Sequence, residues 1–353
     1  MPILPAPEQL LDEHRLYDQY VDVVSAFEWI FTDIEAMPET VTHFERFPRL
    51  HGHDNNLATP DFTVVFKDGA GLVAEIARIA LPDESVESLC SQLARYDALT
   101  QLPGPGGRLI DVNFVDVLLL VPLELGTDVV RRVIKERMPD KHHPYAPSTA
   151  PCVVQFVAQS DRYVFQRRPD VENGVLRDGV RDPALGGWLQ QSDFKPKASG
   201  FAHRKAARPF MNDPIAPLYL ACQLWTKVFA TRTADVAAVG DYKPLVMTTT
   251  EIAEDLRQQY GRGSKRDVRR AMEILPATRC AQQVEPDLWR VAWGDLAHQA
   301  GEDLSEVLAR RTAKPPAKGT IKRLIETYED LGITDPLAKR DDAVAQLFDD
   351  SDY

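Results

Sequence analysis

Two carboxylates on a predicted β-hairpin are the residues best suited to chemistry. Asp61 follows Pro60 and precedes a run of β-forming residues at 62–66, while Glu75 lies in a second such run at 72–80. Carboxylates at the open end of one hairpin offer the hard oxygen ligands that Mg²⁺ takes, with Mn²⁺ as a substitute. A bound Mg²⁺ can activate a water molecule for attack on a phosphodiester. The pair therefore predicts a metal site and a hydrolytic reaction.

The surroundings of Glu75 favour a functional role for its carboxylate. With a period of two residues, Val73, Glu75 and Ala77 share one face of the second strand. An ionised carboxylate is costly to bury among apolar side chains unless a cation or a metal compensates it. A helix is expected next, at 85–99, and its Gln92 and Tyr96 are four residues apart, so both lie on one helical face.

In chain order, Pro60-Asp61, Glu75-Ile76-Ala77 and the Gln92–Tyr96 pair resemble the PD-(D/E)xK nuclease superfamily. The pair itself resembles the Q-x-x-x-Y motif of the RecB-like branch. The resemblance covers residues 10–160 and implies a restriction-endonuclease-like fold, in which Asp61 and Glu75 hold Mg²⁺ while Gln92 and Tyr96 orient the metal-bound water or the scissile strand. It also implies an acidic residue on the first helix, for which the alternatives are Glu28, Asp33 and Glu35.

The catalytic lysine of this superfamily has no counterpart at its usual place. Two residues after the glutamate, this chain has Ala77. The positive charge could instead come from Lys67 on the turn, from Arg78 or from Arg95 on the helix, although Arg78 belongs to the opposite face of its strand and a guanidinium stays protonated. Either the cation has moved or the nuclease is inactive.

Residues 248–293 have the outline of a winged helix-turn-helix. A threonine cap precedes a helix at 251–260, a turn at 261–264 leads to a second helix at 265–275, and a hairpin follows at 280–293. We expect Val268, Met272 and Leu275 to face inward. The predicted DNA-binding residues form a basic stripe on the second helix and its turn: Arg262, Lys265, Arg266, Arg269 and Arg270. The alternative is a solvated face on a module that only contacts proteins.

The net charge of −12 conceals this basic region. Residues 1–60 carry −8 and residues 326–353 carry −7, which leaves +3 for the part between them. Five bases and no acid lie in 195–208, and seven bases against two acids lie in 257–279. An acidic protein can therefore still present cations to a nucleic acid.

The expected architecture is α/β: a restriction-endonuclease-like mixed sheet flanked by helices, plus a mainly α winged-helix domain. The predicted segments are a nuclease-like domain (1–160), a basic connecting region (161–212), the winged helix-turn-helix domain (213–300) and a helical, acidic tail (301–353). Four scattered cysteines and the lack of a signal peptide or membrane span indicate a reduced, cytoplasmic protein. His51-Gly52-His53-Asp54 and His142-His143 are interpreted as polar loop residues, since no further ligands complete a metal set.

Three functional alternatives follow. The first is Mg²⁺-dependent cleavage of DNA in antiviral (phage) defence, mobile-element processing or repair; the second is an inactive pseudo-nuclease that binds DNA or assembles partners; the third is a transposon end-cleaving subunit. No P-loop motif is present, so a nucleotide-driven step would need an ATPase or another protein subunit as partner, and a homodimer is also open.

Overall fold

The computed structural model describes residues 4–34, 40–51, 57–77, 83–97, 99–137, 151–168, 195–237, 244–278, 280–292 and 303–312. The chain divides into two compact units. One unit comprises Gln19–Asn212, and the other comprises Met1–Asp18 together with Asp213–Tyr353. The opening helix, α1 (Pro7–Asp33), therefore contributes its first residues to one unit and its remainder to the other.

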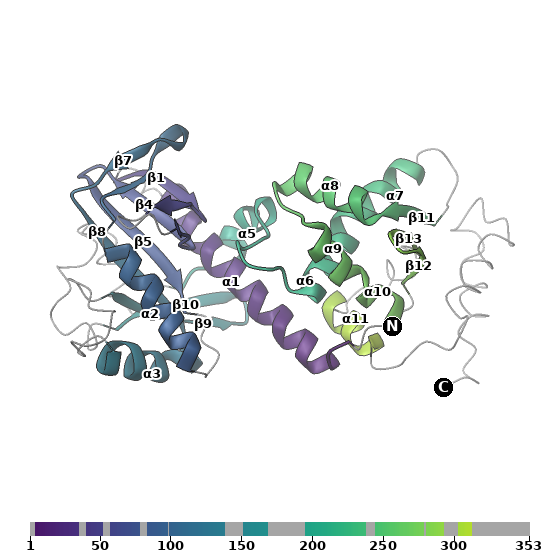
Figure 1. Ribbon diagram of the computed structural model, residues 1–353, viewed down its shortest axis with the longest axis horizontal. Helices are drawn as coiled ribbons and strands as arrows, with labels where there is room; N and C mark the ends of the chain where they lie inside the picture. The colour runs from purple at the N-terminus through teal and green to yellow at the C-terminus, as the bar shows by residue number, and fades with distance from the viewer. Residues whose placement is uncertain are drawn as a thin grey trace, which may run out of the picture. The chain divides into compact units, whose positions relative to one another are not determined.

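A six-stranded mixed sheet forms the centre of the unit 19–212 (Figure 1). Its strands follow the spatial order β1 (Val41–Arg46), β4 (Phe62–Phe66), β5 (Ala70–Ile76), β8 (Phe114–Pro122), β9 (Cys152–Gln159) and β10 (Arg162–Arg167). The pairs β5–β8 and β8–β9 are parallel, and the other neighbours are antiparallel. The unit also contains α2 (Asp83–Asp97), α3 (Gly126–Val129), the π-helical η3 (Val130–Arg137), α5 (Ala198–Ala207), and the short elements β2 (Leu50–His51), β3 (Leu57–Ala58), β6 (Gln101–Pro103), β7 (Leu109–Asp111), η1 (Pro105–Gly107) and η2 (Leu123–Leu125).

Helices cover both faces of this sheet. On one face, Phe27 and Phe31 of α1 pack against Phe62 of β4, with ring centroids 5.4 and 6.4 Å away. On the other face, α2 and η3 enclose a core that contains Val65 and Val73. Alternating residues of β4 thus serve two different cores, which explains why this strand is buried along its whole length.

The hairpin that carries the candidate carboxylates is confirmed as β4 and β5, with Phe62 opposite Ala74. The sequence Lys67-Asp68-Gly69-Ala70-Gly71 predicts a five-residue turn, but the turn is shorter because β5 already begins at Ala70. Gly69 adopts φ +83°, and a Cβ there would lie 2.5 Å from the side-chain nitrogen of Asn113. The turn therefore favours glycine for its backbone conformation, and any larger residue would also have to displace the Asn113 side chain.

Apolar residues at helical spacing predict a helix near the N-terminus, and a nearly continuous apolar run predicts a buried strand at 112–121. These elements and the helix expected at 85–99 correspond to α1, β8 and α2. The sequence also favours a short strand at 163–166 within the predicted connecting region, and this strand is β10, which completes the sheet. Neither β1 nor α5 was expected. Both elements carry many polar residues, and their sequences alone do not show with which elements they pack.

The second unit is mainly helical, with one small sheet. Its elements are α6 (Pro217–Gln223), the π-helical η5 (Leu224–Phe229), α7 (Ala230–Ala237), β11 (Leu245–Thr248), α8 (Thr249–Tyr260), α9 (Lys265–Met272), α10 (Ile274–Ala277), β12 (Ala281–Glu285), β13 (Leu288–Val291) and α11 (Leu304–Thr312). The three strands form an antiparallel sheet in the order β11-β13-β12. The predicted order of helix, turn, helix and hairpin is present. The strand β11 was not predicted from the sequence.

Local sequence explains where α8 begins and ends and where α9 begins. The Thr248 hydroxyl accepts the Glu251 N–H, and the Glu251 carboxylate accepts the Thr248 N–H in return, which is a capping box. Gly261 ends α8 in the left-handed conformation, with φ 69°. Ser264 then caps α9 by accepting the Asp267 N–H at 3.0 Å.

Within the described ranges, no helix is long and apolar enough to span a membrane. The motifs at 52–54 and 142–143 and the acidic tail beyond residue 312 lie outside those ranges.

Candidate functional site

The open end of the β4–β5 hairpin brings Asp61 and Glu75 together. Asp61 immediately precedes Phe62, and Glu75 immediately follows Ala74, the residue that pairs with Phe62. The Asp61 N–H donates to the Ala74 carbonyl at 2.9 Å, and Asp61 Oδ2 accepts the Ile76 N–H at 2.8 Å. The Asp61 carboxylate is therefore held against the backbone of the residue next to Glu75. Both acids are buried, with 1% and 6% of their surface exposed.

Tyr96 of α2 connects the helix to this pair. Its hydroxyl donates to Glu75 Oε2 at 2.7 Å and accepts from Gln92 Nε2 at 2.7 Å. Burial, followed by the negative charge of Glu75, raises the pKa of Tyr96 well above its usual value, so the hydroxyl remains a donor. The structure thus joins Gln92, Tyr96 and Glu75 in one hydrogen-bonded chain, and Gln92 and Tyr96 share a helical face, as their four-residue spacing predicted.

The donor chemistry of the carboxylate pair fits Mg²⁺. This ion is usually bound by one or two carboxylates, with water and substrate phosphates completing its coordination. Two adjacent buried carboxylates also favour a cation beside them, because like charges oppose each other. Asp61 and Glu75 are the residues that would hold it. In the described part of the chain, no group of three or more His, Cys, Asp or Glu side chains forms a more extensive metal site.

The structure does not bring Lys67 to the carboxylates. Asp61 precedes β4 and Lys67 follows it, so six residues of extended chain separate them, which is about 20 Å at the usual rise of a strand. Arg95 is exposed on α2, and its Nη1 lies 3.4 Å from the Leu57 carbonyl. Arg78 lies outside the described residues. Ala77, two residues after Glu75, is fully buried in the core beneath α2.

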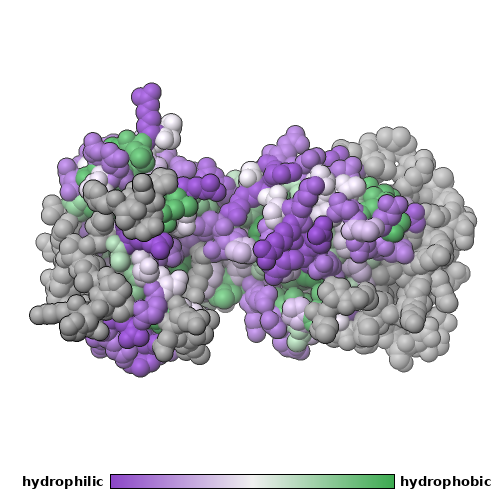
Figure 2. Space-filling view, viewed as in Figure 1, coloured by the Kyte–Doolittle hydropathy of each residue, from purple (hydrophilic) through white to green (hydrophobic). Residues whose placement is uncertain are grey.

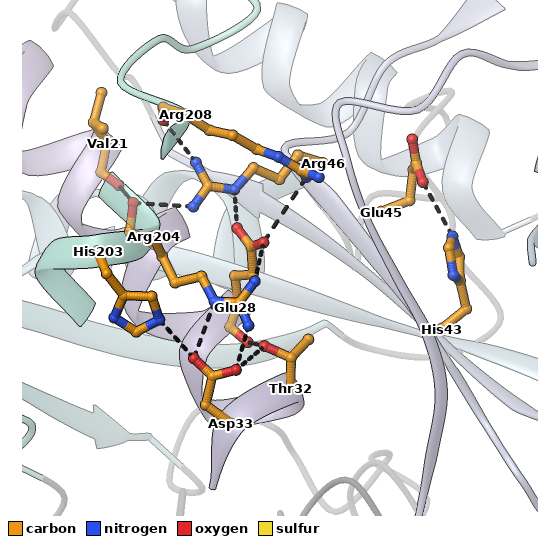
Figure 3. Close-up of polar contacts among 11 residues, drawn as sticks. Val21, Glu28, Thr32, Asp33, His43, Glu45, Arg46, His203, Arg204 and Arg208 are labelled. Carbon is orange, nitrogen blue, oxygen red and sulfur yellow. Dashed lines mark hydrogen bonds and ion pairs between the residues drawn. The ribbon is translucent and has the colours of Figure 1, made fainter. Parts of the chain in front are cut away.

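The acids proposed for the first helix lie against a cluster of arginines (Figure 3). Glu28 is 4% exposed and accepts from Arg46 Nε at 2.5 Å, while Arg204 Nη1 lies 3.4 Å from its other oxygen. Asp33 accepts from Arg204 Nε at 3.0 Å and pairs with His203 at 2.9 Å. The hydrogen bond from Arg204 holds the pKa of Asp33 below its usual value. Glu35 lies outside the described residues.

Only part of this arginine cluster could be predicted from the sequence. The sequence showed a basic run at 195–208 but predicted no helix there, and Arg46 is a single cation in a strand that no spacing pattern links to Glu28. Arg46 Nη2 also donates to the Ser25 hydroxyl at 3.0 Å, and Nη1 donates to the Arg208 carbonyl at 2.9 Å. Arg46 therefore joins α1, β1 and the end of α5.

Helix α9 presents the basic stripe that its sequence predicted. Lys265, Arg266, Arg269 and Arg270 are exposed, whereas Val268, Met272 and, in α10, Leu275 are fully buried. Arg262 is half-buried on the preceding turn. Arg269 Nη2 lies 3.7 Å from Asp287 at the tip of the β12–β13 hairpin. Figure 2 shows hydrophilic residues gathered over α8 and α9 on the face in view.

No family model, curated protein or solved structure matches this chain in the comparisons. Its function therefore has to be inferred from the residues themselves.

Proposed function

We propose that the protein is a Mg²⁺-dependent nuclease that cleaves DNA, with a restriction-endonuclease-like domain coupled to a winged-helix DNA-binding domain. The observation that carries the proposal is the buried carboxylate pair Asp61–Glu75 with Tyr96 bonded to Glu75. A neutral donor fixed on a buried carboxylate orients that carboxylate for a cation while leaving its charge in place.

Each residue of the pair has a separate positioning contact. The Ile76 N–H fixes one oxygen of Asp61, and Tyr96 fixes one oxygen of Glu75, so neither carboxylate rotates freely. Gln92 holds the Tyr96 hydroxyl with its donor directed at Glu75. Mg²⁺, when bound, would supply a more acidic water and neutralise charge that develops on the phosphate. The chain's own contribution is a preformed, largely dry acceptor pair.

The exposed cations of α9 support DNA as the substrate. Basic residues at positions i, i+1, i+4 and i+5 form one stripe on a capped helix, which suits contacts with phosphates or base edges in a major groove. Each phosphate contact contributes about 0.9 to the slope of log affinity against log salt. For Arg266→Ala with Arg269→Ala we expect a slope lower by about two such contacts, measured by fluorescence anisotropy at several salt concentrations.

The control for that experiment is Lys227→Ala with Arg310→Ala, since the pair removes the same amount of charge from other elements of the same unit. A general charge effect would lower the slope equally in both double variants. An unchanged slope in the α9 variant would assign this module to protein contacts.

The burial of Ala77 favours a second candidate function, a non-catalytic DNA-binding or assembly protein. The alanine side chain cannot bring a cation to the phosphate, and it is fully buried among apolar residues. The nuclease-like sheet would then survive as a scaffold.

Cleavage of supercoiled and linear DNA separates the two candidates. Wild-type protein with Mg²⁺ or Mn²⁺ is expected to cut, and Asp61→Asn and Glu75→Gln are expected to abolish cutting while retaining DNA binding. Binding without cleavage under every divalent metal would support the scaffold. Cleavage that survives in both variants would remove this site from the reaction.

A further inference from the structure

The rim of the arginine cluster holds a guanidinium that the fold does not use. Arg208 follows α5, and its side chain is 59% exposed. Among the described contacts, its guanidinium donates no hydrogen bond, and it forms one ion pair, with Glu28 at 3.9 Å from Nη1. A guanidinium has five N–H donors, so this group is available for a ligand.

Glu28 is already compensated before Arg208 is counted. Arg46 binds one of its oxygens at 2.5 Å, and Arg204 approaches the other at 3.4 Å while also pairing with Asp33. The two carboxylates are thus matched by Arg46 and Arg204, and Arg208 adds one positive charge to the cluster (Figure 3). Repulsion from Arg208 and Arg204 contributes to lowering the pKa of Arg46, although burial is the larger cause.

This excess charge lies close to the carboxylate end of the sheet. Arg46 is the β1 residue that pairs with Phe62, and the next residue, Phe47, donates its N–H to the Asp61 carbonyl at 3.1 Å. The segment after Arg208 returns to the same place, since Asn212 Nδ2 lies 3.4 Å from the Thr59 carbonyl. An anion at Arg208 would therefore lie at the end of the sheet that bears Asp61, on the face that α1 covers, while Glu75 bonds Tyr96 on the face that α2 covers.

We propose that Arg208, supported by Arg46 and Arg204, binds a backbone phosphate of the DNA strand that reaches Asp61 and Glu75. The inference rests on the proposed function, because it takes DNA as the ligand of that site. A phosphate would accept several of the unused Arg208 donors and would reduce the repulsion among three guanidiniums. The paired Glu28 and Asp33 hold the supporting arginines in position without neutralising Arg208.

The substitution Arg208→Gln tests this role with little risk to folding. The backbone carbonyl of Arg208 accepts a hydrogen bond from Arg46. A substitution of the Arg208 side chain leaves this carbonyl in place. We expect the midpoint of thermal unfolding to stay unchanged or to rise, since one repulsive charge is removed. A structural role for Arg208 would instead lower it.

DNA binding is measured for this variant in the background Arg266→Ala/Arg269→Ala, with Ca²⁺ in place of Mg²⁺ and a short fluorescent duplex. Arg208→Gln is expected to lower the salt slope by about 0.9, the value of one phosphate contact. Lys197→Gln is the matched control, because it removes an exposed cation at the other end of α5 and is expected to leave the slope unchanged.

The outcomes are distinct. An unchanged slope in Arg208→Gln, with wild type binding DNA, overturns this inference and leaves the proposed function standing. Equal losses in Arg208→Gln and Lys197→Gln also overturn it, because they would reflect net charge alone. Failure of the wild-type protein to bind DNA overturns the proposed function and this inference together.

Discussion

Removing the hydroxyl of Tyr96 tests both the packing and the chemistry of the site. In Tyr96→Phe the ring remains in its buried position, while Glu75 Oε2 loses a donor at 2.7 Å. A hydrogen bond to a charged group contributes about 1.5–3 kcal/mol. For a unit of this size, 1 kcal/mol corresponds to about 2–4 °C in Tm. We therefore expect a Tm lower by about 3–12 °C, measured by circular dichroism.

The matched control is Tyr163→Phe. Its hydroxyl donates to Asp22 Oδ2 at 2.9 Å, and both residues are buried in the same unit. Lys205 also pairs with Asp22, at 2.8 Å, so this carboxylate keeps a partner and the loss should be smaller, about 1 kcal/mol. The control thus separates loss of stability from loss of activity.

The DNA cleavage rates of these two variants decide whether Tyr96 positions a functional carboxylate. Substituting residues that orient metal ligands commonly reduces activity about 10–100-fold, and we expect this for Tyr96→Phe but not for Tyr163→Phe. Both rates are measured well below the Tm of each variant. An unchanged Tm in Tyr96→Phe would refute the hydrogen bond, and a lower Tm with full cleavage would refute the positioning role.

Three further predictions concern single groups. The folded-state pKa of Asp33 is below its usual 3.8, so its contribution to stability is present above about pH 4 and is lost as the pH falls through the folded value. Urea unfolding between pH 2.5 and 6 should therefore show a smaller loss of stability at acid pH for Asp33→Asn than for the wild type. An equal loss in both proteins would contradict this role. Thr248→Ala removes the cap of α8 and should lower the free energy of unfolding by about 1 kcal/mol, whereas Thr248→Ser, which keeps a hydroxyl, should retain most of the stability. Equal free energies of unfolding for the two variants would argue against capping. Burial raises the pKa of the Cys90 thiol to about 11, so at pH 8 it should react with a thiol reagent only after unfolding, and rapid labelling of the folded protein at Cys90 would contradict its burial.

Alternation and helical spacing were sufficient to predict much of the site. The period of two residues placed Glu75 on the same face as Val73 and Ala77, which the structure shows to be covered by α2, and the four-residue spacing placed Gln92 and Tyr96 together. Both inferences depend only on the geometry of one element. The same geometry argues against Lys67 as a site residue, because the predicted five-residue strand separates it from Asp61.

Contacts between distant segments could not be predicted in this way. Arg46 and Glu28 are 18 residues apart, and Arg204 and Glu28 are 176 apart, in elements whose own periodicity says nothing about their partners. The strands β1 and β11 are similarly defined by the neighbours with which they pair. Single-sequence patterns report local geometry, whereas these features depend on tertiary packing.

The most direct test of the carboxylate site is the stoichiometry of Mn²⁺ binding, measured from the electron paramagnetic resonance signal of free Mn²⁺. We predict that wild-type protein binds one more Mn²⁺ than Asp61→Asn/Glu75→Gln, and that Asp128→Asn/Glu136→Gln, which removes two exposed acids, binds as wild type does. Mg²⁺ should displace the additional ion. Equal Mn²⁺ binding by the wild type and the Asp61/Glu75 variant would contradict the assignment of these two residues as a metal site.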